Sequence, residues 1–216
     1  MHQTPGDESS MDLDTVDELL TTTRSVRKRL DLNRDVDPAV IQHCLELAIQ
    51  APTGSGIPRY HFLVITDANA RAQLGEVYRR AFNAIWEQRA DEVGQRVEAR
   101  NKGSFDYLAE HLHEVPVHVI PCVEMLPGTT RSASAGGELT SILPATWSFM
   151  LALRARGIGT TLTTIHTMYE EEVAEMLGVP EHIRQVALLP VAHFTGERFK
   201  PARRAPARER TYWGQW

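Results

Sequence analysis

The sequence is poor in cysteine: only Cys44 and Cys122 occur among its 216 residues, and both stand in apolar runs. Two such thiols make no disulfide framework, so we expect reduced, buried cysteines in a cytoplasmic protein. A basic excess is also lacking, because the formal net charge is −5. This charge argues against a protein that binds nucleic acid or membrane surfaces in general. The N-terminus, MHQTPGDESSMD, has neither the basic nor the apolar stretch of a secretory signal.

Common catalytic and nucleotide-binding motifs are missing too. The sequence has no HExxH, CxxC, GxSxG or GxGxxG, and PTGSG at residues 52–56 lacks the spacing of a P-loop. Three histidines, His111, His113 and His118, lie close together, but the first two point to different sides of a predicted helix. We therefore expect no metal site and attribute any chemistry to a bound cofactor.

One largely apolar stretch, at residues 136–165, has no charged residue between Glu138 and Arg154. Its apolar residues cover nearly the whole circumference at helical spacing, which predicts a helix buried on all sides. About 15 uncharged residues rise only about 22 Å, less than the roughly 30 Å of a bilayer core, so a membrane span is disfavoured. Because one small core rarely requires such a helix, its second face predicts a homodimer.

Pro144 limits how this helix begins. Since proline lacks an N–H, either the helix starts near Ser141, with Pro144 in its first turn, or it bends at Pro144. Gly157 and Gly159 are expected to end the helix, and the β-branched run at residues 160–165 predicts a strand.

Helices and strands alternate along the rest of the chain, which predicts an α/β or α+β sandwich. Asp37 as N-cap and Pro38 at the first helical position predict a helix that Pro52 ends. Further helices are predicted after Asp12 or Asp14, at 68 to about 100 with a break near Gly94, at 104–114 and at 169–177, and further strands at 60–66, 117–124 and 186–194. Residues 1–11 are expected to form a disordered tail before a single domain at 12–216.

Two basic clusters stand far apart in this acidic sequence. The first holds Arg24, Arg27, Lys28 and Arg29, and the second holds Arg198, Lys200, Arg203 and Arg204. Guanidinium groups suit phosphate oxygens, and Ser25 adds a hydroxyl donor between two arginines. These clusters are interpreted either as solvated surface patches or as a phosphate site.

Four segments, in this order, carry a resemblance to a known family: TRSVRKRL, APTGSGIPRYHFLVI, RGIGTTLTT and LLPVAHFTGERFKPARRAP. Together they resemble the nitroreductase family of FMN enzymes over about residues 14–216. The resemblance implies an α+β fold, a three-layer α/β/α sandwich with a mostly antiparallel sheet. It also implies an intertwined homodimer with two FMN sites at the subunit interface and a C-terminal extension on the FMN-binding domain.

The resemblance also implies site residues. Those matching the family's phosphate-binding positions are Arg24, Ser25 and Arg27, joined by Arg204 with Arg203 as a helper; the family often has a further arginine where this chain has Thr23. Those expected along the isoalloxazine are Leu162, Thr163, Thr164 and Ile165, with a backbone N–H near N5. Thr164 and His166 are candidates to orient substrate, and ordinary structural roles are the alternative for both.

The loop after residue 50 departs from the family pattern. Gly56 and Pro58 stand where asparagine and glutamine are usual, so two side-chain amides are absent. Backbone contacts to flavin are expected from the loop residues Pro52, Thr53, Gly54, Ser55 and Gly56. Arg59 either compensates beside the flavin N1–C2=O edge or is an exposed residue paired with a carboxylate.

The function implied is an FMN-dependent oxidoreductase. Hydride from NADH or NADPH would pass through flavin N5 to a flat, electron-poor acceptor, a nitroaromatic or quinone, by a ping-pong mechanism. The alternatives are a flavin storage or redox-sensing dimer with little turnover, and a scaffold that has lost flavin binding. Four aromatic residues in the 68–114 region, Phe82, Trp86, Phe105 and Tyr107, are interpreted either as a lid over the flavin or as core packing.

Overall fold

The computed structural model describes residues 11–88, 99–125 and 137–216. The chain divides into two compact units, one formed by residues 24–196 and the other by the two ends of the chain, up to Thr23 and from Glu197. The predicted tail at residues 1–11 lies outside the described residues except for Met11. A single domain over 12–216 remains a prediction.

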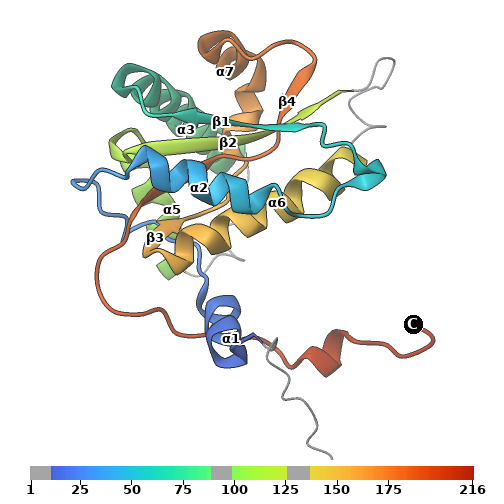
Figure 1. Cartoon of the computed structure of the whole chain (residues 1–216). Coiled ribbons are helices and arrows are strands. Elements are labelled where there is room, and N and C mark those ends of the chain that lie inside the picture. The colour runs from blue at the N-terminus through green and yellow to red at the C-terminus, as the bar shows by residue number, and fades with distance from the viewer. Residues whose placement is uncertain (1–10, 89–98, 126–136) are drawn as a thin grey trace, which may run out of the picture. The chain divides into compact units, whose positions relative to one another are not determined.

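The larger unit is built on a five-stranded sheet (Figure 1). Its strands are β1 (Tyr60–Ile65), β2 (Val117–Glu124), β3 (Ile158–Thr160), β4 (Ile183–Gln185) and β5 (Leu189–His193). They run in the order β1-β2-β5-β3, with β4 also paired to β2, and every strand pair is antiparallel. The strands predicted at 60–66 and 117–124 are confirmed. The one predicted at 186–194 is shorter, and β4 was not predicted.

Two helices cover one face of this sheet, α2 (Pro38–Ala48) and α6 (Gly137–Ala155). The Asp37 side chain accepts a hydrogen bond from the Ala39 N–H, which confirms the predicted N-cap. α2 ends at Ala48, before Pro52. The core between these helices and the sheet contains Ile41, Cys44, Ala48, Val117, Val119, Phe149, Leu153, Leu189 and Val191.

α6 begins at Gly137, so Pro144 lies inside the helix rather than in its first turn. Ile142 and Phe149 are completely buried, whereas Leu143 is 41% exposed and Trp147 is 44% exposed. Burial on all sides is therefore wrong for the single chain, because no described element covers the stripe that carries Leu143 and Trp147.

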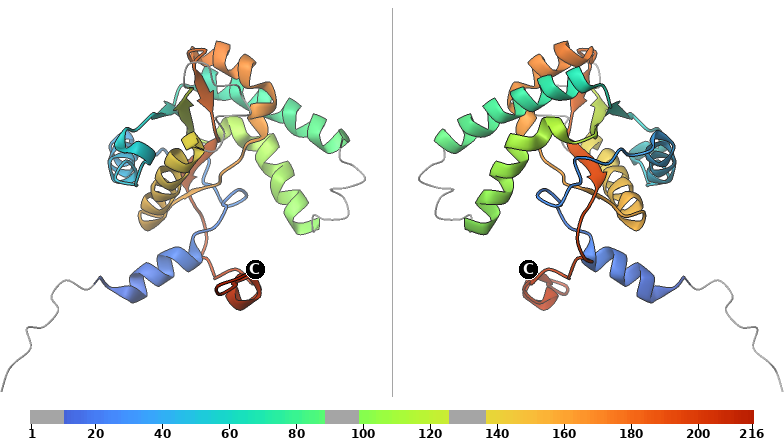
Figure 2. Two further views of the ribbon diagram at one scale, coloured as in Figure 1. Left: turned by 90° about the vertical axis from the view of Figure 1, so that its right-hand side faces the viewer. Right: turned by 90° about the vertical axis from the view of Figure 1, so that its left-hand side faces the viewer.

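The opposite side of the sheet carries α3 (Ala68–Gln88) and α5 (Ala99–His111) (Figure 2). Three shorter elements accompany them: η2 (Leu112–Glu114), η3 (Ile165–Tyr169) and α7 (Glu170–Leu177). α5 begins five residues before the predicted start, and the break predicted near Gly94 lies outside the described residues. α7 ends as predicted at Gly178, which has φ +66°. The fold is the predicted α+β sandwich with three layers and a mostly antiparallel sheet.

The chain after α6 corrects one prediction. β3 ends at Thr160, and residues 161–164 form no strand, although Thr163 makes one isolated bridge with Leu188. The β3–β5 register continued beyond Thr160 places Thr161 opposite Pro190. Because Pro190 has no N–H, it cannot complete a hydrogen-bonded pair there, and the ladder is interrupted. Gly157, with φ +72°, makes the turn after α6, whereas Gly159 lies within β3 and does not end the helix.

The smaller unit contains α1 (Leu13–Thr22) and η4 (Ala207–Arg210). Of the two predicted N-caps of α1, Asp12 and Asp14, the structure has Asp12, whose side chain accepts hydrogen bonds from the Asp14 and Thr15 N–H groups. Leu20, on α1, is 50% exposed. Among the described helices of both units, none has the length and apolar character needed to cross a bilayer.

Candidate functional site

The first basic cluster lies along the edge of the sheet, beside β3 (Figure 1). Ser25 forms a parallel bridge with Thr160, and the Val26 N–H donates to the Thr160 carbonyl at 3.0 Å. A Cβ at Gly159 would lie 3.1 Å from the Val26 side chain, so a larger residue here would require the Val26 side chain to shift. The structure thus brings Arg24, Ser25 and Arg27 next to the chain that follows α6.

Arg27 carries the most unusual charge in this segment. Its guanidinium carbon lies 4.4 Å from the Phe105 ring centroid, a cation–π contact with α5. Its Nε is buried and has no hydrogen-bond partner among the described residues. Burial lowers the pKa of Arg27, and the interaction that opposes this shift is with the Tyr78 phenol rather than with a carboxylate. A partly buried guanidinium of this kind is suited to an anion that the described chain does not supply.

The segment 161–164 is anchored at Thr163. Its N–H donates to the Leu188 carbonyl at 3.0 Å, its carbonyl accepts from the Leu188 N–H at 2.7 Å, and its Oγ1 lies 3.0 Å from the Tyr78 hydroxyl. Thr161 is buried, whereas Leu162 and Thr164 are exposed. Leu162 and Thr164 therefore alternate with the buried Thr161 and the anchored Thr163, and they remain available to a ligand.

His166 is completely buried on η3. Burial lowers its pKa to about 4, against the influence of Glu170, so the ring is neutral near pH 7. Neither ring nitrogen has a hydrogen-bond partner among the described residues. This position favours the structural alternative for His166, whereas the exposed Thr164 keeps its candidate role.

The clustered histidines His111 and His118 lie in different surroundings. His111 pairs with Glu114, with 2.6 Å between Nδ1 and Oε1, and His118 is completely buried in β2. Burial lowers the pKa of His118 to about 3. Within the part of the chain that the structure describes, no group of three or more histidine, cysteine or acidic side chains is arranged to hold a metal ion.

The loop at residues 52–56 lies at the other end of α6. The Gly54 N–H donates to Ser141 Oγ at 3.0 Å, and about 21 Å of helix separates Ser141 from the end of α6. Gly56 has φ +68°, a left-handed conformation that glycine adopts readily and asparagine next most readily. Glycine thus suits the backbone where the family has asparagine, while the side-chain amide is lost. Within one chain, this loop and the arginine segment lie toward opposite ends of α6.

Two arginine assignments depend on other parts of the chain. Arg59 forms an ion pair with Glu124, with 3.9 Å between Nη1 and Oε2, and is about half exposed. This pair matches the second interpretation, an exposed arginine beside a carboxylate. Arg203 and Arg204 are exposed residues of the smaller unit, and their convergence with Arg27 on one phosphate remains a prediction.

The aromatic residues of the 68–114 region pack mainly against other side chains. Phe82 is buried and meets Trp86 edge to face at 5.6 Å, and the Tyr107 ring lies tilted against His111 at 4.3 Å between ring centroids. These contacts favour core packing for Phe82 and Tyr107. Phe105 differs from them because its ring contacts Arg27.

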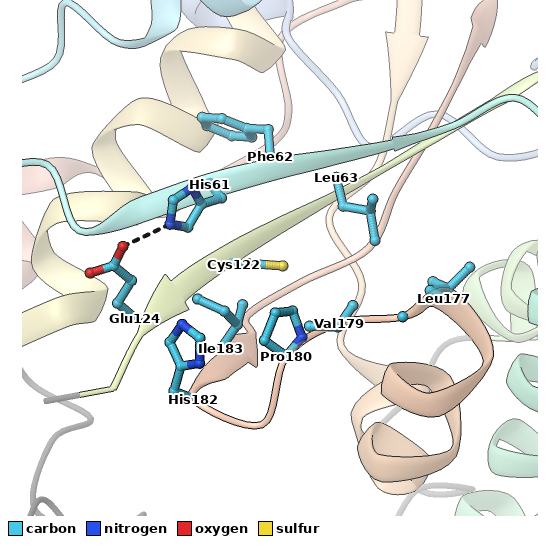
Figure 3. A pocket seen from close by; sticks show the side chains of 11 residues that line it. His61, Phe62, Leu63, Cys122, Glu124, Leu177, Val179, Pro180, His182 and Ile183 are labelled. Carbon is cyan, nitrogen blue, oxygen red and sulfur yellow. Dashed lines mark hydrogen bonds and ion pairs between the residues drawn. The ribbon is translucent and has the colours of Figure 1, made fainter. Parts of the chain in front are cut away.

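A hollow of about 400 Å³ lies elsewhere on the sheet (Figure 3). Leu63, Cys122 and Ile183 form part of its apolar wall, and His61 and Glu124 lie at its polar end with a hydrogen bond of 3.0 Å. None of the residues predicted for the cofactor site lines this hollow. The Glu124 carboxylate at its polar end already pairs with His61 and Arg59. The hollow is therefore separate from the arginine segment and from the other residues predicted to bind FMN.

The sequence matches the family model described as nitroreductase family over residues 20–193. The chain belongs to the nitroreductase family. A 4-nitrobenzoate reductase from Nocardioides sp. (strain LMS-CY) is 25% identical over 203 residues, which cover 79% of this chain and 76% of that protein.

Solved structures of nitroreductases share the fold. An FMN and NADPH-dependent nitroreductase from Sphigopyxis sp. strain HMH has a TM-score of 0.70 at 18% identity, covering 93% of this chain and 99% of its own. An FMN-dependent nitroreductase from Mycobacterium smegmatis, solved in complex with NADPH, has a TM-score of 0.68 at 21% identity, covering 94% and 100%. At these identities the likeness establishes the nitroreductase fold for this chain.

Sequence reasoning did not predict the contact that Tyr78, on α3, makes with Thr163. No local signal points to its partner, because Thr163 lies 85 residues further along the chain.

Proposed function

We propose that the protein is an FMN-dependent NAD(P)H oxidoreductase. The observation that carries this proposal is the partly buried Arg27, whose Nε has no partner among the described residues and which is placed beside Thr160 and the exposed segment that follows it. Family membership and the nitroreductase relatives support it. When bound, FMN supplies the acceptance and transfer of hydride, chemistry that side chains lack.

The residues present fit a flavin phosphate. Arg24 and Arg27 provide guanidinium donors, and Ser25 provides a hydroxyl between them. The buried hydroxyls of Thr160 and Thr161 have no hydrogen-bond partner among the described residues, so further donors stand beside the same segment. In this proposal the arginine segment binds the phosphate, with Arg204 and Arg203 joining from the C-terminal extension. Positioning is then the work of the protein, and no protein nucleophile is required.

A homodimer completes the site. The Pro52–Gly56 loop and the arginine segment lie toward opposite ends of α6 in one chain, so a second protomer must bring its loop to the first protomer's arginines. The uncovered stripe of α6 with Leu143 and Trp147 supplies an apolar surface for this association. Burying two such side chains contributes roughly 1.5–3 kcal/mol each to association.

The proposed substrates are NADH or NADPH and a flat, electron-poor acceptor such as a nitroaromatic or quinone. Leu162 and Thr164 present an exposed edge to such molecules, and one position would serve both in turn. This arrangement implies ping-pong kinetics, with parallel lines in double-reciprocal plots of initial rate.

An absorbance spectrum of the purified protein from 350 to 500 nm tests cofactor binding directly. Anaerobic addition of NADH and NADPH in turn should bleach the flavin bands, and a nitroaromatic or menadione should restore them. A yellow protein that neither nicotinamide bleaches would instead support the storage or sensing dimer, which the missing amides at Gly56 and Pro58 favour. A colourless protein that FMN does not reconstitute would refute both.

A further inference from the structure

A buried tyrosine connects the two parts of the proposed site. Tyr78, on α3, is only 2% exposed, and its hydroxyl lies 3.0 Å from Thr163 Oγ1. Burial raises the pKa of the Tyr78 phenol, whereas the neighbouring Arg27 charge and the Thr163 contact oppose that shift. The same phenol therefore contacts the threonine of the segment assigned to the flavin ring and lies within electrostatic reach of the guanidinium assigned to the phosphate.

Thr163 is the fixed point of that segment. The interruption opposite Pro190 leaves residues 161 and 162 outside the ladder, and the chain is next held by the paired hydrogen bonds between Thr163 and Leu188. Backbone bonds to one residue allow the flanking peptide groups to rotate. A side-chain bond from α3 removes part of that freedom, because it approaches from a different element.

We propose that Tyr78 is a positioning residue of the cofactor site: its hydroxyl fixes Thr163, and with it the flanking exposed residues Leu162 and Thr164, relative to Arg27. The inference rests on the proposed function. A site held in this way binds its ligand more tightly because less ordering is required on binding.

The test compares two tyrosine-to-phenylalanine variants of the full chain. Tyr78→Phe removes the hydroxyl that contacts Thr163, and Tyr169→Phe makes the same change in a ring that lies 5.0 Å from the Arg80 guanidinium carbon. FMN titrations followed by flavin fluorescence should show Kd raised about threefold to tenfold for Tyr78→Phe, the effect of one hydrogen bond. Tyr169→Phe should stay within about twofold of the unchanged protein. A Tyr78→Phe variant with a lowered Tm and an unchanged Kd would overturn the positioning role.

A double-mutant cycle asks whether Tyr78 acts through Thr163. Thr163→Val removes the partner hydroxyl, and the double variant should bind FMN no more weakly than the weaker single variant. Fully additive losses in the double variant would contradict a shared bond.

Amide hydrogen exchange of flavin-free protein keeps this inference separable from the proposed function. Tyr78→Phe should speed exchange of the Thr163 amide about threefold to tenfold, because local opening becomes easier. If the unchanged protein binds no FMN, the proposed function fails. The hydrogen-exchange measurement then tests by itself whether the Tyr78–Thr163 hydrogen bond holds Thr163. An unchanged exchange rate of the Thr163 amide in Tyr78→Phe would refute this holding role whether or not FMN binds.

Discussion

Replacing Arg27 by alanine is the most direct perturbation of the proposed cofactor site. The guanidinium is partly buried over Phe105, and its Nε has no partner among the described residues, so its loss removes a charge-assisted contact to phosphate without exposing a carboxylate partner. Such contacts contribute about 1.5–3 kcal/mol, which corresponds to an increase in Kd for FMN of about 13-fold to 160-fold. The lost cation–π contact with Phe105 acts on free and bound protein alike and largely cancels from the binding free energy.

The assay is titration of flavin-free protein with FMN, followed by fluorescence quenching at low and high salt. Arg27→Lys keeps the charge but loses the planar fork, so its Kd should fall between those of the unchanged protein and Arg27→Ala. Arg79→Ala is the matched control, because Arg79 is an exposed arginine that pairs with Glu76 within α3. Arg204→Ala should weaken binding as Arg27→Ala does if both ends of the chain supply one phosphate site. Unchanged FMN affinity in a folded Arg27→Ala variant would refute the phosphate assignment.

Three further predictions concern stability and assembly. Gly75→Ala should destabilise the fold by about 1–3 kcal/mol in urea unfolding, because its Cβ would lie 2.8 Å from the His113 Cβ, although alanine usually stabilises helices. Trp147→Glu should shift the sedimentation coefficient from dimer to monomer at micromolar concentration, because a charge would enter the proposed apolar interface. The free energy of unfolding should fall as the pH drops from about 6.5 toward 4. His118 and His166 have folded-state pKa values of about 3 and about 4, so in this range they bind fewer protons in the folded than in the unfolded protein. Each histidine contributes a slope of up to about 1.4 kcal/mol per pH unit.

Each of these predictions has an internal comparison. Gly103→Ala meets only the flexible end of Lys28, so it should be neutral or stabilising, and equal effects at Gly75 and Gly103 would contradict the close helix packing. Gln73→Glu adds a charge on an exposed part of α3 and should leave the dimer intact. For the pH effect, unfolding at pH 7 and pH 5 should differ less in a His118→Leu variant, and an identical difference would remove His118 as a cause.

Local signals in the sequence account for the elements whose ends depend on their own residues. Asp12 and Asp37 accept the first N–H groups of α1 and α2, as their spacing predicts. Gly178 ends α7 in the left-handed conformation that glycine adopts most readily. The strand at 117–124 is also predicted with its observed bounds, because an apolar run between a proline and a loop leaves few alternatives.

The site follows the same division. The basic residues 24–29 and residues 162–165 were named as site candidates from the sequence, because side-chain type and order can be read there, but the strand predicted at 160–165 ends at Thr160. The unpartnered Nε of Arg27 and the hydrogen bond that holds Thr163 depend instead on residues that lie far along the chain. Arg27 meets Phe105 and Tyr78 meets Thr163 across 78 and 85 residues, distances at which sequence patterns carry no information about contact.

The sequence by itself determined the caps, the apolar stripes, the long central helix and the identity of the basic segment, since each depends on residues within a few positions of one another. Tertiary structure alone decided that β3 stops at Thr160, one position before Pro190, that Val26 packs on Gly159, and that Tyr78 contacts Thr163. These are pairings between separate elements, and they exist only after the sheet has set its register and the helices have packed against it.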